Sequence, residues 1–516
     1  MPSTHTTSVD ANPPEPSDRP GPSAAAPRMP LRQALGLILG PVLGGATFLS
    51  LFLGAEDLST EACSVAGVTV LMAVWWMTEA LPFAATALLP VGLFPLLGVA
   101  DIVDSAAPYA SDTVFLFLGG FVVALTMQRW QLHRRIALRT VLAVGTKPTR
   151  IIAGFMIATC FISMWVSSTA TTMMMLPMGL SVIALLRKDG RELDHNFSTC
   201  LMLGIAFAAT ISTTSTVVAT PGNAFVVAYM AESHGVHISF AQWMAVGTPL
   251  ALVFLCIAWF LLTRVIYPPR IDEIPGGERL IRSQYTELGR MSRGERIIAA
   301  VFVITALSWI FIPLLSGTAS VEAVAPWLSR FSEAGIAVLA AIACFLIPVR
   351  PAQGQMLMRW EDTKELPWGV LLMFGGGLSM SAMITRTGLS EWIGDRVSVL
   401  EGVHTVIVIV AVAVLVLFLT ELTSTTATIT TYVPVFGGIA MGLGLDPLVL
   451  VLTTVFAAGF AFMLPVATPP NAIAISTGHV TIGQMVRGGW CLNLVGIVLV
   501  PIAVLTLGVW VFSLSL

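Results

Sequence analysis

The sequence predicts an all-α polytopic membrane protein with about eleven transmembrane helices and two re-entrant hairpins, arranged as inverted repeats. Three observations predict it: long apolar runs, basic residues placed unevenly between them, and short motifs that recur in the same order. The 516-residue chain is 56% hydrophobic and 11% charged, with a mean hydropathy of +0.87. Soluble domains carry about 25% charged residues, so a water-soluble fold is excluded. A net charge of -3 gives no reason to expect a nucleic-acid partner.

The basic residues orient the apolar runs, because loops rich in Lys and Arg stay on the cytoplasmic side. Arg28 and Arg32 precede the first apolar run, and the loop after that run carries only acidic charges. Residues 1–30, rich in Pro, Ser, Ala and Thr, are predicted to be a disordered cytoplasmic tail. Counting spans from there, with the runs near 66–79 and 82–99 as the second and third, puts the C-terminus outside, in a multi-pass protein of the cell membrane that contacts lipid.

Two apolar stretches, residues 151–186 and 403–441, are too long for one straight span. Basic residues flank the first stretch on both sides, so both of its ends should face the cytoplasm. We predict a re-entrant helical hairpin there and a second one, entering from outside, at 403–441. Ser and Thr occupy the middle of each stretch, where irregular backbone is tolerated only if it lines a cavity or is buried in protein. The alternative is an ordinary helix whose Ser and Thr hydroxyls bond to its own carbonyl groups.

Three motifs recur about 250 residues apart in the same order. They are Phe117-Leu118-Gly119-Gly120 with Met373-Phe374-Gly375-Gly376, Ser167-Ser168-Thr169-Ala170-Thr171 with Ser424-Thr425-Thr426-Ala427-Thr428, and Ala219-Thr220-Pro221-Gly222-Asn223 with Ala467-Thr468-Pro469-Pro470-Asn471. The span count places the two copies in opposite orientations. The third motif puts Pro inside the predicted spans 197–230 and 446–476, which should therefore be broken helices. Inverted repeats with broken helices at matching positions are typical of transporters whose binding site lies at the midplane.

At these motifs the chain resembles the divalent anion/sodium symporter (DASS) family of dicarboxylate, citrate and sulfate carriers. The resemblance runs from about residue 66 to the C-terminus and includes the Trp75–Pro82 segment, Phe115–Phe121 and His133-Arg134-Arg135. It implies a homodimeric elevator transporter that holds a small anionic substrate beside sodium ions. Family members carry Asn in the middle of each hairpin tip, whereas this chain has Ser168 and Thr425.

The resemblance also implies roles for the motif residues. For sodium it implies oxygen ligands from six positions, namely Ser167, Ser168, Ala219, Ser424, Thr425 and Ala467. For the substrate it implies eight positions, namely Ser168, Thr169, Thr220, Pro221, Thr425, Thr426, Thr468 and Pro469. The implied organisation has scaffold helices at 31–150, the first transport-domain half at 151–267, a cytoplasmic loop and scaffold helices at 268–402, and the second transport-domain half at 403–516.

The function expected is secondary active transport of a small divalent anion such as a C4-dicarboxylate, coupled to sodium. A sodium-independent anion exchanger, a proton-coupled carrier and sulfate as substrate remain open, because Ser and Thr replace the motif asparagines. An enzyme is not expected, since the chain lacks a zinc-protease motif and a nucleophile elbow. Glu421, an acidic residue inside an apolar stretch, is expected either to organise the site or to make a structural hydrogen bond.

Overall fold

The computed structural model describes residues 30–145, 147–188, 194–274, 276–316, 326–397 and 403–515. The predicted tail, apart from its last residue, lies outside these described residues. Within them, ten helices are long and apolar enough to cross a membrane, and four more apolar helices are shorter. A small antiparallel ribbon, β1 with β2, is the one sheet in the described part of the chain. The predicted class, an all-α polytopic membrane protein, is therefore confirmed.

The helices follow the predicted order closely. The elements before the internal loop are α1 (Leu31–Gly54), α2 (Thr60–Thr78), α3 (Phe83–Thr86), α4 (Leu89–Leu96), α5 (Ile102–Ala106), η1 (Ala107–Ala110), α6 (Asp112–Arg129), α7 (Leu132–Val144), α8 (Pro148–Ser163), α9 (Ser168–Lys188), α10 (His195–Ile211), η2 (Ser212–Thr214), η3 (Val217–Ala219), α11 (Pro221–His234), α12 (Phe240–Phe260) and η4 (Leu261–Ile266). The later elements are α13 (Gly277–Glu287), α14 (Arg293–Ser316), η5 (Pro326–Arg330), α16 (Glu333–Leu346), β1 (Pro348–Arg350), η6 (Pro351–Gln353), β2 (Gln355–Met356), η7 (Trp360–Glu365), α17 (Trp368–Arg386), α18 (Leu389–Val397), α19 (Thr405–Leu422), α20 (Thr425–Gly442), α21 (Pro447–Ala458), α22 (Pro469–Ser476), α23 (Ile482–Ala503), η9 (Val504–Gly508) and α24 (Val509–Phe512).

The two halves match element for element around the hairpins. Each long stretch is a pair of helices with a short break between them, α8–α9 in the first half and α19–α20 in the second. Each is followed by a broken helix, α10 then α11 and α21 then α22. The residue before each distal half-helix, Thr220 or Thr468, has nearly the same extended backbone (φ -142°, ψ 153° and φ -142°, ψ 143°).

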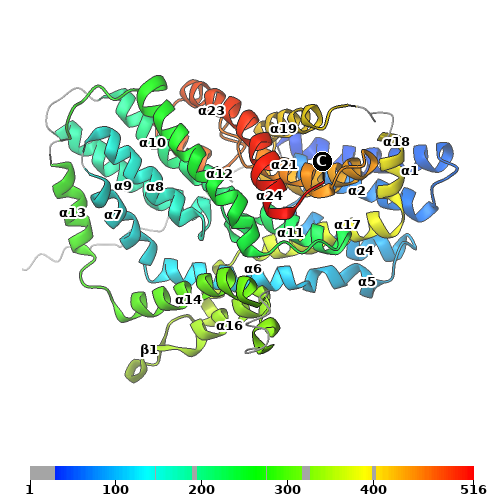
Figure 1. Cartoon of the computed structure of the whole chain (residues 1–516), viewed down its shortest axis with the longest axis horizontal. Coiled ribbons are helices and arrows are strands. Elements are labelled where there is room, and N and C mark those ends of the chain that lie inside the picture. The colour runs from blue at the N-terminus through cyan, green and yellow to red at the C-terminus, as the bar shows by residue number, and fades with distance from the viewer. Residues whose placement is uncertain are drawn as a thin grey trace, which may run out of the picture.

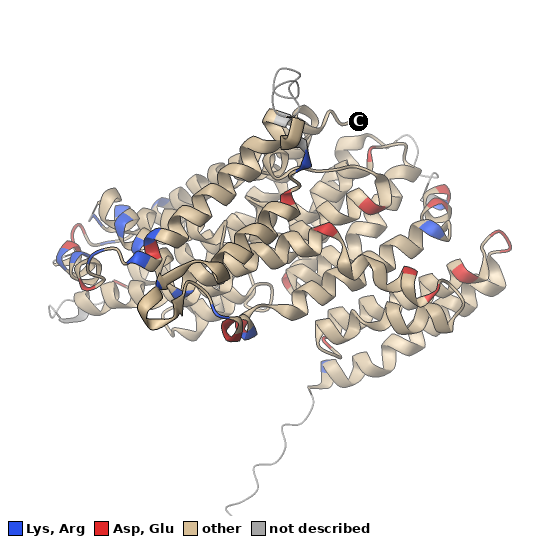
Figure 2. Cartoon of the chain, turned by 90° about the horizontal axis from the view of Figure 1, so that it is seen from below, with Lys and Arg blue, Asp and Glu red and all other residues tan. Residues whose placement is uncertain are grey.

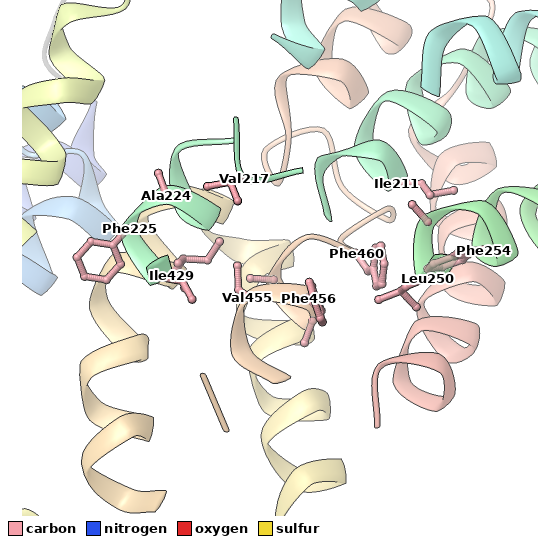
Figure 3. Close-up of a cluster of buried hydrophobic side chains, with 14 of the residues drawn as sticks. Ile211, Val217, Ala224, Phe225, Leu250, Phe254, Ile429, Val455, Phe456 and Phe460 are labelled. Carbon is pink, nitrogen blue, oxygen red and sulfur yellow. The ribbon is translucent and has the colours of Figure 1, made fainter. Parts of the chain in front are cut away.

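The halves are cross-packed rather than side by side. The half-helix α11 packs on α20 of the other half, and α22 packs on α9. Gly222 permits the first contact, because a Cβ there would lie 2.3 Å from Cδ1 of Ile429. Figure 3 shows Ile429 from α20 beside Ala224 and Phe225 of α11. Each hairpin is thus completed by a segment from the other repeat.

The most completely buried long helices are α10 and α21, the first segments of the two broken helices. Nearly every residue of both helices is buried, whereas α1 exposes most of its apolar side chains at the outer edge of the molecule (Figure 1). An exposed apolar face of this kind suits contact with lipid. Three glycines at four-residue spacing (Gly36, Gly40 and Gly44) let α1 approach α2 closely, as small residues commonly do between membrane helices.

The span expected near 82–99 is shorter and interrupted. It consists of the four-residue α3 and the eight-residue α4. Pro82 and Pro90 cannot donate backbone hydrogen bonds, so the helix restarts between them. Gly376 of α17 fits against this interruption, since a Cβ there would lie 2.2 Å from the carbonyl oxygen of Ala87. The glycine run at 375–377 therefore serves close packing.

Charged residues are segregated along the molecule. Figure 2 shows Lys and Arg gathered toward one end of the long axis, and Asp and Glu spread mainly toward the other. In α7, Arg135 is only 8% exposed and pairs with Glu295 of α14, at 2.8 Å between Nε and Oε1. Its remaining N–H groups donate to the carbonyl oxygens of Leu288 and Gly289. This buried pair fixes the surface helix α7 to the start of α14.

Candidate functional site

A cavity of about 270 Å³ lies where the hairpin tips meet the helix breaks. It is lined by residues from both halves and from neighbouring helices: Phe121, Ala124, Trp165, Ser167, Ser168, Thr169, Thr210, Thr213, Val218, Ala219, Thr220, Pro221, Gly222, Pro367, Val370, Thr425, Thr426, Gly459, Thr468, Pro469 and Pro470. Among the described residues, no charged side chain contributes to this lining. Any charge on a bound molecule must therefore be balanced by backbone dipoles or by a second bound ion.

Four helices begin at this cavity. The first residues of α9, α11, α20 and α22 all belong to its lining, two helices from each half. A helix N-terminus carries partial positive charge, which favours an anion by about 0.3–1 kcal/mol. The helix α22 contributes this dipole alone, because it begins with Pro469 and Pro470, which have no N–H group. Four such ends around one small cavity favour an anion without any Lys or Arg. The helices that precede these four in the chain are α8, α10, α19 and α21. Their last turns carry carbonyl groups that suit a cation.

Asparagine side chains stabilise both breaks in the same way. The Asn223 amide donates to the carbonyl oxygens of Thr213 (2.6 Å) and Thr216 (2.7 Å), which lie ten and seven residues earlier. The Asn471 amide donates to Ala461 (3.4 Å) and Leu464 (3.2 Å), at the same sequence distances. These bonds replace helical ones that the break removes, because buried carbonyl groups need donors. The repeat predicted from motifs therefore extends to the hydrogen bonds that shape the site.

Nearly all the residues implied by the family resemblance come together here. Ten of them line the cavity, and they are Ser167, Ser168, Thr169, Ala219, Thr220, Pro221, Thr425, Thr426, Thr468 and Pro469. The other two, Ser424 and Ala467, directly precede the lining residues Thr425 and Thr468 in the chain. The carbonyl oxygen of Ala467 accepts a hydrogen bond from the Thr425 hydroxyl at 3.3 Å, so tip and break are in contact in the second half.

Sequence reasoning missed two hydroxyl groups of the lining, Thr210 and Thr213. The Thr210 hydroxyl lies 3.4 Å from that of Thr468, which links the two halves across the cavity. The Thr213 hydroxyl donates to the carbonyl oxygen of Thr210 at 2.6 Å, leaving its lone pairs as acceptors. The run of Ser and Thr from 210 to 216, inside a predicted span, is the signal that could have identified them.

Part of the cavity lining, the apolar wall, carries no hydroxyl or charged side chain. Phe121 and Ala124 come from α6, Val370 from α17, and Trp165 from the break between α8 and α9. These side chains offer neither donors nor positive charge to a carboxylate, apart from the Trp165 indole N–H, which is buried without a partner. The wall thus confines the polar contacts of a ligand to the tips and breaks.

The oxygen atoms around the site suit a hard cation as well as an anion. Hydroxyl and carbonyl oxygens are the ligands that such cations take, and the second half places one of each 3.3 Å apart at Thr425 and Ala467. The described residues contain no cluster of His, Cys, Asp and Glu that could hold a transition metal. The available ligand chemistry therefore fits sodium.

The sequence matches the family described as "Sodium:sulfate symporter transmembrane region" over residues 46–514. It is 38% identical over 484 residues to the sodium-dependent dicarboxylate transporter SdcS of Staphylococcus saprophyticus, covering 92% of this chain and 91% of the relative. The protein of the same name from a Staphylococcus aureus strain is 39% identical over 482 residues, covering 92% and 90%. Both relatives are named transporters, which agrees with the prediction that the chain is not an enzyme.

Two solved transporters share the fold at 12% sequence identity. YdaH of Alcanivorax borkumensis has a TM-score of 0.55 and covers 93% of this chain and 98% of its own. MtrF of Neisseria gonorrhoeae has a TM-score of 0.56, with 95% and 96% covered. At this identity the likeness concerns the arrangement of helices alone.

Proposed function

Because the chain belongs to the sodium:sulfate symporter family, we propose that it is a secondary transporter that moves a C4-dicarboxylate together with sodium ions. The observation that carries the proposal is the convergence of four helix N-termini on one cavity whose lining has no charged side chain among the described residues. A doubly charged anion needs positive charge when it leaves water. The dipoles supply part of it, and sodium ions supply the rest. The two staphylococcal relatives are named for sodium and dicarboxylate, which supports both assignments.

Each substrate carboxylate would be held by one hairpin tip. Ser168 and Thr169 serve one end of the molecule, and Thr425 and Thr426 the other. Thr220, Pro221, Thr468 and Pro469 complete the pocket. This two-ended arrangement favours a dicarboxylate over sulfate, which has a single centre of charge. The apolar wall offers no positive charge for a third carboxylate, so the cavity suits a dicarboxylate better than citrate.

Sodium ions would bind between tips and breaks. In the first half the ligands are oxygens of Ser167, Ser168 and Ala219, and in the second half those of Ser424, Thr425 and Ala467. Bound there, sodium lies beside the carboxylates and offsets their charge. The loss of the motif asparagines leaves hydroxyl oxygens in place, which are still ligands for a hard cation.

The movement that exposes this site to each side is proposed to be an elevator motion. Residues 151–267 and 403–516 form the moving transport domain, while 31–150 and 268–402 form the scaffold of a homodimer. The cross-packing of the hairpins with α11 and α22 supports a single moving unit. The end of the molecule rich in Lys and Arg would face the cytoplasm, with the N-terminus, and the C-terminus would lie outside.

Uptake of labelled succinate into proteoliposomes should require sodium. Replacing external sodium with choline should lower the initial rate at least tenfold, because the dicarboxylate would enter a cavity without compensating charge. An imposed pH gradient in choline is the control for proton coupling. Unchanged uptake in choline contradicts sodium coupling, and inhibition of uptake by sulfate but not by fumarate contradicts the dicarboxylate assignment.

Restoring the family asparagines should strengthen binding. In the double variant Ser168→Asn and Thr425→Asn, each new amide can donate to a carboxylate while its oxygen faces the cation. Two added hydrogen bonds of about 1 kcal/mol each predict a gain in succinate affinity of tenfold or more in sodium. Thermal unfolding with graded succinate measures it, and Ser181→Asn on α9, at a half-buried position outside the cavity lining, serves as control. A loss of affinity would show that the hydroxyls are shaped for a different anion.

A further inference from the structure

Glu421 is a carboxylate buried at the end of α19, three residues before the second tip serine and only 3% exposed. Its oxygens accept hydrogen bonds from the backbone N–H groups of Phe462 (2.8 Å), Met463 (2.9 and 3.1 Å) and Leu464 (2.9 Å). The Asn493 amide of α23 donates a further bond at 2.7 Å. Every partner is a donor, which suits the ionised carboxylate, since that form only accepts.

The negative charge of Glu421 has no cationic partner among the described residues. Its hydrogen bonds connect it directly to the site. The backbone N–H of Leu464 donates to Glu421. The carbonyl oxygen of Leu464 accepts hydrogen bonds from the Ala467 N–H and from the Asn471 amide. The carbonyl oxygen of Ala467 in turn accepts a hydrogen bond from the Thr425 hydroxyl. The negative charge of Glu421 is thus connected to the second break through the backbone of Leu464 and Ala467.

The first half makes the corresponding connection with neutral groups. There the Thr216 hydroxyl donates to the carbonyl oxygen of Met164 at 2.5 Å, joining the same break to the same hairpin end. Met164 directly follows α8, Glu421 is the second-last residue of α19, and both lie three residues before the tip serine, Ser167 or Ser424. The two halves are therefore alike in backbone and different in charge.

We infer that Glu421 is a positioning residue that makes the cation site of the second half the stronger of the two, through its charge more than through its hydrogen bonds to residues 462–464. This inference rests on the proposed sodium coupling. A buried negative charge near a cation site attracts the cation through a medium that screens poorly. The first site, next to the neutral Met164–Thr216 connection, lacks that contribution. Sodium should accordingly bind first in the second half.

Two substitutions separate the charge of Glu421 from its reach. Glu421→Gln keeps the length of the side chain and one acceptor oxygen but removes the charge. Glu421→Asp keeps the charge but shortens the reach to the loop. Thr216→Val is the matched control, because it removes the neutral connection of the first half.

The measurement is the sodium concentration that gives half of the sodium-dependent rise in unfolding temperature, without any anion, checked against succinate uptake. We expect that concentration to rise at least tenfold in Glu421→Gln, less in Glu421→Asp, and less than twofold in Thr216→Val. An Asp effect equal to or larger than the Gln effect would overturn the inference, because reach alone would then explain it. If Glu421→Gln yields no folded protein, Glu421→Asp decides alone. A tenfold rise of its half-maximal sodium concentration overturns the inference, and a rise below threefold supports it. A wild-type protein indifferent to sodium refutes the proposed function itself, which is a separate outcome.

Discussion

Asn223→Ala should destabilise the protein by about 3 kcal/mol and abolish dicarboxylate uptake. The change removes two short hydrogen bonds of the buried Asn223 side chain, so the carbonyl group of Thr213 loses its side-chain donor and that of Thr216 keeps only the Ala219 N–H at 3.3 Å. Each lost bond has a net value of about 1 kcal/mol, and an unsatisfied buried carbonyl adds a desolvation cost. Uptake should be lost because Thr213, Ala219 and Thr220 line the cavity on the segment that these bonds hold. Thermal unfolding in detergent and succinate uptake measure the two effects.

Two further asparagines calibrate this result. Asn471→Ala removes the equivalent but longer bonds of 3.4 and 3.2 Å, so its effect should have the same sign and be smaller. Asn196→Ala removes one exposed bond to Pro268 and should change the unfolding temperature little. Equal effects of Asn196→Ala and Asn223→Ala would show that the bonds across the break have no special role.

Gly119→Ala should destabilise the protein by at least about 3 kcal/mol. A Cβ at this position would lie 2.4 Å from both the carbonyl carbon and the carbonyl oxygen of Ala337 on α16. Because these atoms belong to the backbone of a neighbouring helix, no side-chain rotation relieves the contact and α6 must move away from α16. Overpacking of a buried contact commonly costs about 1–3 kcal/mol, and backbone contacts lie at the upper end. Chemical or thermal unfolding of the purified variant gives the value.

The neighbouring glycine is the control. A Cβ at Gly120 would meet Cγ1 of Val218 at 3.4 Å and Cη2 of Trp309 at 3.9 Å, which are ordinary van der Waals contacts. Gly120→Ala should therefore change stability by less than about 1 kcal/mol, with a small gain from helix propensity. If the two alanine variants were equally stable, the close approach of α6 and α16 would be wrong.

Much of the fold and of the candidate site could be predicted from sequence because both depend on local patterns. Long apolar runs specify spans, and Pro at 221 and 469 specifies breaks, since it cannot donate a helical hydrogen bond. The tips were found because Ser and Thr interrupt apolar stretches too long for one span. The same patterns predict a span near 82–99, which the prolines at 82 and 90 divide into the short helices α3 and α4.

What sequence could not provide are contacts between distant segments. Thr210 belongs to the site because α10 packs against the break before α22, where the Thr210 hydroxyl lies close to that of Thr468. Besides the Asn493 amide, the hydrogen-bond donors to Glu421 are backbone N–H groups, which every sequence contains, so nothing in the sequence distinguishes residues 462–464. The paired donors of Asn223 and Asn471 likewise depend on how the chain bends at each break. Such contacts are consequences of tertiary packing and require coordinates.

The cross-packing of the two repeats also has a consequence for biosynthesis. The first hairpin tip contacts α22, which begins at Pro469 and is synthesised about 300 residues after Ser168. At about 5–20 residues per second, roughly 15–60 s pass before that partner leaves the ribosome. During this interval the hydroxyl groups and free N–H groups of the first tip lie within the membrane and are not yet covered by α22. Nascent chains halted before residue 469 should therefore hold the first hairpin in an accessible state, open to labelling at the tip and to quality-control proteases.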